Sequence, residues 1–292
     1  MAELVVTSGR RWPTVARPHR ATRWLSEPRQ RRALVSFALV LAIWQLGATS
    51  AGWLGHSLPW IGQLPAPLDV ARAWLALAVD PGYWHSWLAS GGRVALGFGA
   101  AVTLGVPFSL LLADSAWFRG VAYPVFELLR PVPPLAWVPA AIIFWPTQEL
   151  SIAFVIFLGA FYPIVINVLG GARTLDVRLL QTARSFGASR WQVLSRLLWP
   201  AVLPSLAVGM EVGIGITWEV VVAAEMISGG GSGNAAASGG GLGFLIWSSY
   251  VGGSYAQIVV GMISIGIAGY ASSAALRWLG AKLAPWGAER AG

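Results

Sequence analysis

Six long stretches of this sequence carry almost no charged side chains, and they constrain the fold more than any other feature. A helix crosses the hydrocarbon core of a bilayer with about 20 mostly apolar residues. The six stretches are residues 33–53, 87–113, 121–145, 150–170, 204–227 and 256–278. Charged residues make up only 11% of the chain, against about 25% in soluble domains. We therefore predict an all-α membrane protein with six transmembrane helices.

The basic residues predict which way the chain crosses the membrane. If the spans alternate in direction, 17 of the 20 Lys and Arg fall on one side, Arg72 falls on the other, and Arg93 and Arg130 lie within spans. Because Lys and Arg gather in cytoplasmic loops, we predict that both termini are cytoplasmic. The chain then divides into a basic cytoplasmic arm (residues 1–32), a transmembrane domain (33–278) and a cytoplasmic tail (279–292).

The basic arm carries eight Arg and precedes an uncharged stretch that is longer than the core of a signal peptide. These lengths favour a retained anchor, while the Arg-rich, acid-poor composition leaves a transit peptide as the alternative. The basic excess does not indicate nucleic-acid binding, because 19 of the 20 basic residues are Arg and eight of them sit in the arm.

Several kinds of site are missing from the sequence. The only lysine, Lys282, lies between Ala281 and Leu283, so the chain has no phosphate-binding loop of the G-x-x-x-x-G-K-[ST] type. There is no cysteine, and the three histidines are scattered. We therefore expect no enzyme activity, no metal site and no cofactor bound by this chain. The Gly-rich segment 229–243 has no lysine and is interpreted as a flexible loop between spans.

The most informative connection is residues 174–200, which carries four of the Arg assigned to the cytoplasmic side. Asp176 is a suitable N-cap for a helix beginning at Val177, and Gly187 suits the left-handed position that ends it. Ser189 and Gln192 have the spacing of a capping box, which predicts a second short helix. Such an amphipathic pair either lies on anionic lipid or docks to a partner, and the residues alone favour neither alternative.

The same connection resembles the cytoplasmic signature loop of ABC-importer permeases. The matching residues are Gln181-Thr182-Ala183, then Gly187 after three residues, then Leu197-Leu198-Trp199-Pro200 after nine more. Gln181 stands where the family pattern begins with Glu. Segments 65–70, 93–98, 128–139, 157–163, 183–191 and 222–226 also resemble the nitrate/sulfonate/taurine/bicarbonate branch of these permeases.

The resemblance implies a type I ABC importer permease fold in a bacterial cytoplasmic (inner) membrane. It implies alternating access for a small anionic solute of the nitrate, sulfonate/taurine or bicarbonate class. The implied partners are two ATPase subunits that use ATP and Mg²⁺, an extracytoplasmic solute-binding protein and a second permease copy. The implied ATPase contacts form a coupling helix: Gln181, Thr182, Ala183, Arg184, Ser185, Phe186, Gly187, Ala188, Ser189 and Arg190.

Ionisable residues inside spans are costly and are functional candidates by default. The candidates for the translocation path are Glu127, Arg130, Trp137, Glu211, Glu219 and Glu225. Glu127 and Arg130 are spaced to pair on one helix face, beside Pro131, Pro133 and Pro134, which favours a structural role at a bend. Pairing between helices is likewise favoured for the three glutamates, with Arg93 and Arg130 as the available cations. Tyr162, Asn167 and Gln257 are further polar residues without a distinctive pattern.

Two other functions are compatible with the same residues. A proton-coupled secondary transporter would use Glu211, Glu219 and Glu225, and it predicts gradient-driven uptake by the chain alone. A non-transporting membrane anchor would recruit a partner to residues 181–190 without moving a solute.

Overall fold

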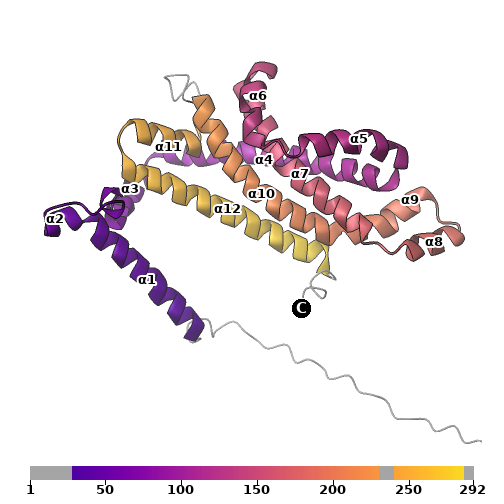
Figure 1. The fold of residues 1–292 in the computed structure, drawn as a ribbon, viewed down its shortest axis with the longest axis horizontal. Helices are drawn as coiled ribbons and strands as arrows, with labels where there is room; N and C mark the ends of the chain where they lie inside the picture. The colour runs from indigo at the N-terminus through magenta and orange to yellow at the C-terminus, as the bar shows by residue number, and fades with distance from the viewer. Residues whose placement is uncertain (1–27, 230–239, 286–292) are drawn as a thin grey trace, which may run out of the picture. The chain divides into compact units, whose positions relative to one another are not determined.

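The computed structural model describes residues 28–229 and 240–285, and all regular structure within these ranges is helical (Figure 1). Residues 1–27 of the basic arm, the centre of the Gly-rich loop and the end of the tail therefore lie outside the described residues. The chain divides into two compact units, Met1–Pro67 and Leu68–Gly292, which we describe separately.

The first unit contains α1 (Pro28–Ala48), α2 (Ser50–Leu54) and a short turn of helix, η1 (Ile61–Gln63). Its stretch Arg31–Ala48 is long and apolar enough to cross a membrane, and only 6% of that stretch is buried. Gly47 lies directly against Ile61 of η1. A helix that is apolar around its whole circumference and uncovered within its own unit suits contact with lipid.

The second unit holds the remaining helices. They are α3 (Pro67–Ala78), α4 (Pro81–Asp114), α5 (Ala116–Leu129), η2 (Pro134–Trp137), α6 (Val138–Phe144), α7 (Gln148–Arg173), α8 (Val177–Ser185), α9 (Arg190–Val193), η3 (Leu194–Leu198), α10 (Trp199–Gly229), α11 (Leu242–Val251) and α12 (Tyr255–Leu283). Four uninterrupted stretches of this unit qualify as spans: α4, α7, residues 190–227 and α12. Spans near 87–113, 150–170, 204–227 and 256–278 are therefore confirmed.

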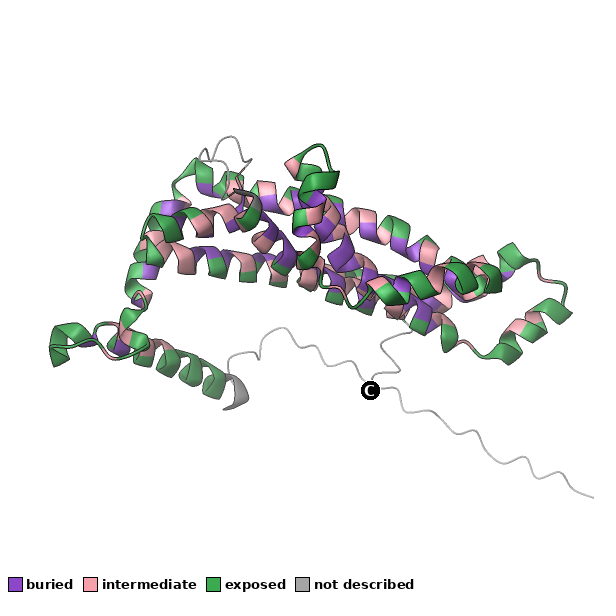
Figure 2. Ribbon diagram, turned by 45° about the horizontal axis from the view of Figure 1, so that its top comes forward, coloured by how far each residue is buried: buried purple, intermediate pink, exposed green. Residues whose placement is uncertain are grey.

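The centre of the unit is α7, which packs against α4 on one side and α10 on the other. Small residues allow these helices to approach closely. A Cβ at Gly97 of α4 would overlap Ile156, and one at Gly171 would overlap Ser205 of α10. Figure 2 shows the buried residues gathered where the long helices meet and the exposed residues on their outer faces. This core fixes the positions of α7 and α10 relative to each other.

The third predicted span, residues 121–145, is not one continuous helix. Here α5 ends at Leu129, and the chain resumes as η2 and α6 after a bend of 91°. Pro131, Pro133 and Pro134 supply no amide hydrogen, so the helical hydrogen bonds cannot continue through them. The prolines thus produce the break that their spacing predicts. The described residues contain five candidate spans, or six if the two helices on either side of this bend together form one span.

The second helix begins at Arg190, directly after the Ser189 cap, as predicted, but it does not end before Pro200. Residues 190–227 form one uninterrupted helical stretch through α9, η3 and α10, with Pro200 and Pro204 inside it. The η3 segment is a wider π-type turn, in which the Trp199 amide donates to the carbonyl of Leu194. Such a turn lets a helix continue past prolines that cannot make the usual bond. The sequence interpretation also missed α11, a ten-residue apolar helix too short to span a membrane.

Candidate functional site

The connection between α7 and α10 is built around α8, whose two ends are capped. The Asp176 carboxylate accepts a hydrogen bond of 2.8 Å from the Arg178 amide at the N-terminus. At the C-terminus, Gly187 has a left-handed φ of 79°. The Gly187 amide donates to the Arg184 carbonyl (2.9 Å), and the Ala188 amide donates to the Ala183 carbonyl (3.0 Å). This pair of bonds is the Schellman arrangement, and it gives α8 a defined length.

The capping box beyond α8 is also present. The Ser189 hydroxyl accepts from the Gln192 amide at 3.3 Å, and the Gln192 side chain accepts from the Ser189 amide at 2.8 Å. Three residues, Thr174 to Asp176, separate α8 from α7, and Ser189 leads directly into the helical stretch that becomes α10. The connection is therefore stiff, and it joins two of the central helices of the unit.

Large apolar side chains of α8 and of its C-cap residue, Phe186, are exposed. Phe186 is 88% exposed, Val177 62% and Leu179 51%. Within α8 itself, the described residues include no buried side chain. An apolar surface projecting from the end of a bundle, as in Figure 1, suits a site at which another protein docks.

A second feature is a groove of about 360 Å³ along the facing sides of α7 and α10, at the bend that ends α5. It is lined by Arg130, Pro134, Leu158, Gly159, Tyr162, Pro163, Ile166, Asn167, Val212 and Ile216. Arg130 pairs with Glu127 at 3.3 Å, and both side chains are nearly half exposed. The structure thus brings Arg130 together with two polar residues of α7, Tyr162 and Asn167, for which the sequence offered no pattern.

Trp137 does not line this groove. It lies on η2 beside a separate, mostly apolar hollow of about 320 Å³ with Phe144, Trp145 and Phe154. Its indole N–H is buried and has no hydrogen-bond partner within the described residues. The structure therefore places Trp137 apart from Arg130, although both belong to the bent third span.

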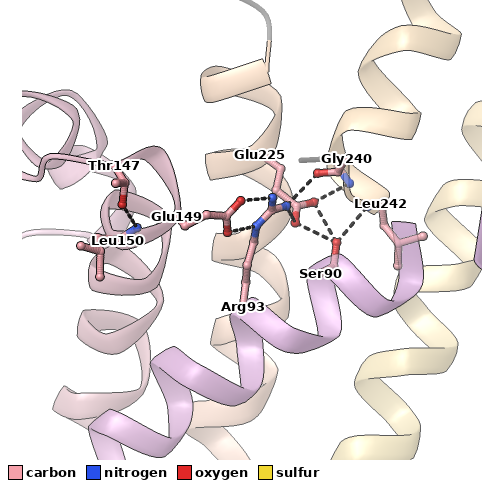
Figure 3. Close-up of polar contacts among 9 residues, drawn as sticks. Ser90, Arg93, Thr147, Glu149, Leu150, Glu225, Gly240 and Leu242 are labelled. Carbon is pink, nitrogen blue, oxygen red and sulfur yellow. Dashed lines mark hydrogen bonds and ion pairs between the residues drawn. The ribbon is translucent and has the colours of Figure 1, made fainter. Parts of the chain in front are cut away.

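Glu225 lies near the C-terminal end of α10 and is enclosed in a polar network (Figure 3). It is 2% exposed, and its carboxylate lies 2.7 Å from Arg93 Nη1 of α4. The hydroxyl of Ser90 donates to the same carboxylate at 2.8 Å, and the Gly243 amide donates to it at 2.9 Å. A buried carboxylate with this many partners is a structural group, and the expected pairing of Glu225 with Arg93 is present.

Arg93 also binds two groups outside α10. Its guanidinium meets the Glu149 carboxylate of α7 through two bonds, Nε–Oε2 at 2.7 Å and Nη2–Oε1 at 2.5 Å. Its Nη1 donates to the Gly240 carbonyl at 2.8 Å, while the Leu242 amide donates to Ser90 at 2.8 Å. The sequence interpretation missed Glu149, because this residue lies just before the predicted span. One arginine therefore joins α4, α7, α10 and the turn before α11.

The other two glutamates of α10 differ from Glu225 and from each other. Glu211 pairs with Arg277 of α12 at 2.5 Å, and both side chains are partly exposed. The sequence interpretation assigned Arg277 to the cytoplasmic end and so missed this pair. Glu219 is exposed, and no hydrogen bond or ion pair joins it to any other described residue.

These features describe a helical membrane protein with a groove between its central helices, which contains Arg130, Tyr162 and Asn167, and with a capped helix at one end. Residues 105–286 match the family described as "Binding-protein-dependent transport system inner membrane component". Curated relatives have similar lengths. The nitrate import permease protein NrtB of Synechocystis sp. is 33% identical over 265 residues, covering 87% of this chain and 90% of the relative.

Two further relatives carry other solute names. The taurine transport system permease protein TauC of Escherichia coli is 31% identical, covering 91% of this chain and 94% of the relative. The bicarbonate transport system permease protein CmpB of Synechococcus elongatus is 30% identical, covering 82% and 84%. This chain belongs to that inner-membrane-component family and is an ABC-importer permease of its nitrate, taurine and bicarbonate branch.

Family membership settles several expectations. The chain is a multi-pass protein of the inner membrane and is not itself an enzyme. As a permease subunit of an ABC importer, it works with an ATPase subunit and a solute-binding protein. The proton-coupled transporter and the non-transporting anchor are correspondingly disfavoured.

Proposed function

We propose that two copies of this chain form the translocation pathway for a small anionic solute of the nitrate, sulfonate/taurine or bicarbonate class. ATPase subunits dock on residues 181–190 of each copy and drive alternating access, while an extracytoplasmic binding protein delivers the solute. ATP and Mg²⁺ are bound by the ATPase subunits, and this chain binds no cofactor. Both termini lie in the cytoplasm, as the distribution of Lys and Arg predicts.

One observation carries this proposal: α8 is stiffly joined to the two helices that form opposite walls of the groove. Tyr162 and Asn167 of α7 line one wall, and Val212 and Ile216 of α10 line the other. A rigid-body displacement of α8 by a docked motor is therefore passed directly to both walls. Small displacements of packed helices are an established way to switch between two conformations.

The surface of α10 supports the pairing of two copies. Val208, Val212, Gly215 and Glu219 are all exposed, and at about 100° per residue they fall within about 60° of one face. Beside this stripe runs the groove containing Arg130. Arg130 in a groove at membrane depth needs protein or water over it, and a second copy laid over the same surface encloses the groove as a pathway.

Gly187 provides the test of the coupling assignment. A Cβ at this position would meet no atom within 4 Å, so a substitution acts through the backbone alone. Leu in the left-handed conformation costs about 1–2 kcal/mol, and we expect Gly187→Leu to lower ATP-dependent uptake and co-purification of the ATPase several-fold. Gly187→Asn should be milder because Asn tolerates this conformation.

The matched control is Gly99→Ala, a helical glycine that also has open space around it. It should assemble and transport as the unchanged chain does. Measurements are made on the complete transporter in proteoliposomes with ATP inside and binding protein outside. Full uptake and assembly by Gly187→Leu would refute docking on this turn.

A further inference from the structure

The three glutamates of α10 differ in whether they have a partner of opposite charge. Glu225 is enclosed with Arg93, and Glu211 pairs with Arg277. Glu219 lies between them on the same helix, is exposed, and has no hydrogen bond or ion pair with a described residue. Among the described residues, the Glu219 carboxylate is therefore the one on this helix without a charged or hydrogen-bonding partner.

Glu219 also lies deep in the predicted span 204–227. Eight residues separate it from the end of that span, which is about 12 Å along a helix. A carboxylate at such depth is too costly to face lipid and belongs against protein or a water-filled path. Around the helix, at about 100° per residue, Glu219 lies about 20° from Val212 and about 60° from Ile216, and both of these residues line the groove.

The charges around the groove do not balance. Among the described residues that line it, Arg130 is the only cation, and it already pairs with Glu127. Adding Glu219 gives two carboxylates for one guanidinium in each copy. A second copy repeats the same excess of negative charge, so pairing between copies does not remove it. A solute that is purely anionic would meet net repulsion on this path.

Building on the proposed function, we infer that Glu219 faces the transported solute and that this solute carries a protonated amine in addition to its anionic group. Arg130 attracts the anionic end, and Glu219 attracts the ammonium end. A zwitterion such as an aminoalkanesulfonate fits both groups. A bare inorganic oxyanion satisfies only Arg130 and leaves the Glu219 charge unpaired.

The local charge is measured first, without any solute or binding protein. The chain has no native cysteine, so Gly215→Cys introduces a single thiol one turn from Glu219 on the same face. In the complete transporter, a trimethylammonium thiosulfonate should label this thiol at least ten-fold faster than a sulfonate thiosulfonate. Adding Glu219→Gln should reduce that ratio several-fold. Leu96→Cys on α4, which is 71% exposed, is the lipid-facing control.

Transport is measured second, with the same binding protein throughout. Uptake of 2-aminoethanesulfonate should exceed that of ethanesulfonate, nitrate and bicarbonate. Glu219→Gln should lower the preference for the amine at least five-fold, while Glu219→Asp should retain it. Asp69→Asn removes a carboxylate that pairs with Arg72 on α3 and serves as the control. If none of the four solutes is transported, the labelling ratio alone tests whether the Glu219 charge faces the path.

A labelling ratio that Glu219→Gln does not change would overturn the inference, and so would faster transport of an amine-free anion by the unchanged chain. Failure of the proposed function has a different signature: no ATPase docks on residues 181–190 and no uptake depends on ATP. The labelling ratio stays measurable in that case, so the two ideas fail separately.

Discussion

At the scale of single residues, the pairing around Arg93 explains how a chain this apolar holds charged groups inside its spans. The arginine satisfies Glu225 and Glu149 together, and each carboxylate comes from a different helix. Two glycines make room for the arrangement: a Cβ at Gly241 or at Gly243 would overlap Glu225. The buried Arg93–Glu225 pair thus connects α4 to α10 and to the turn before α11.

Removing Arg93 should destabilise the chain strongly. Arg93→Met leaves Glu225 buried without its cation, and breaking a buried pair in this way costs about 3–5 kcal/mol. We expect a marked fall in the thermal unfolding temperature of the purified chain in detergent. The double variant with Glu225→Leu should recover part of the loss, because it removes the unpaired charge as well.

Arg72→Met is the control for this experiment. Arg72 also pairs with a carboxylate, Asp69, but its side chain is 70% exposed, and surface ion pairs contribute little. The thermal unfolding temperature of the Arg72→Met variant should equal that of the unchanged chain. A double variant at Arg93 and Glu225 that is no more stable than Arg93→Met would contradict the assignment of Glu225 as the uncompensated group.

At the scale of elements, the short capping patterns are confirmed. Asp176, Gly187, Ser189 and Gln192 have the cap geometry that the sequence predicts, because each cap depends only on residues a few positions away. The helix after Ser189 continues through Pro200 by way of the wider η3 turn. Packing of α10 against α7 holds that turn in place.

The N-cap of α8 should matter for docking. Asp176→Ala removes an N-cap hydrogen bond worth about 1 kcal/mol, so α8 frays, and we expect affinity for the ATPase subunit to fall about five-fold. Asp176→Asn is the matched control, since Asn is an equally good N-cap. Affinity is measured by titrating the ATPase onto the permease in nanodiscs. Equal affinity for the Ala and Asn variants would show that the cap has no part in docking.

At the scale of the whole molecule, the exposed stripe of α10 and the adjoining groove suit an assembly of two copies. A single copy leaves Arg130 and Glu219 uncovered at membrane depth. A second copy provides the protein wall that such groups require. The same argument explains why Glu219 has no ion-pair partner among the described residues of one chain.

Cross-linking should reveal that assembly. Because the chain has no native cysteine, Val212→Cys in membranes should give a dimer on oxidation. Leu96→Cys on the outer face of α4 should give none. Size analysis on a denaturing gel without reductant distinguishes the two results. Cross-linking by Leu96→Cys but not by Val212→Cys would place the interface between copies elsewhere.

The sequence by itself determined the helical membrane class, most of the spans and the capped turn at Gly187, because long apolar runs and local caps need no distant partners. It also singled out Arg93 and Glu225. Only the tertiary structure decided that Glu149 and Ser90 complete their network, that Arg277 neutralises Glu211, and that Glu219 is left free. Residues far apart in the chain meet through the packing of α4, α7, α10 and α12, and no local pattern encodes which side chains that packing brings together.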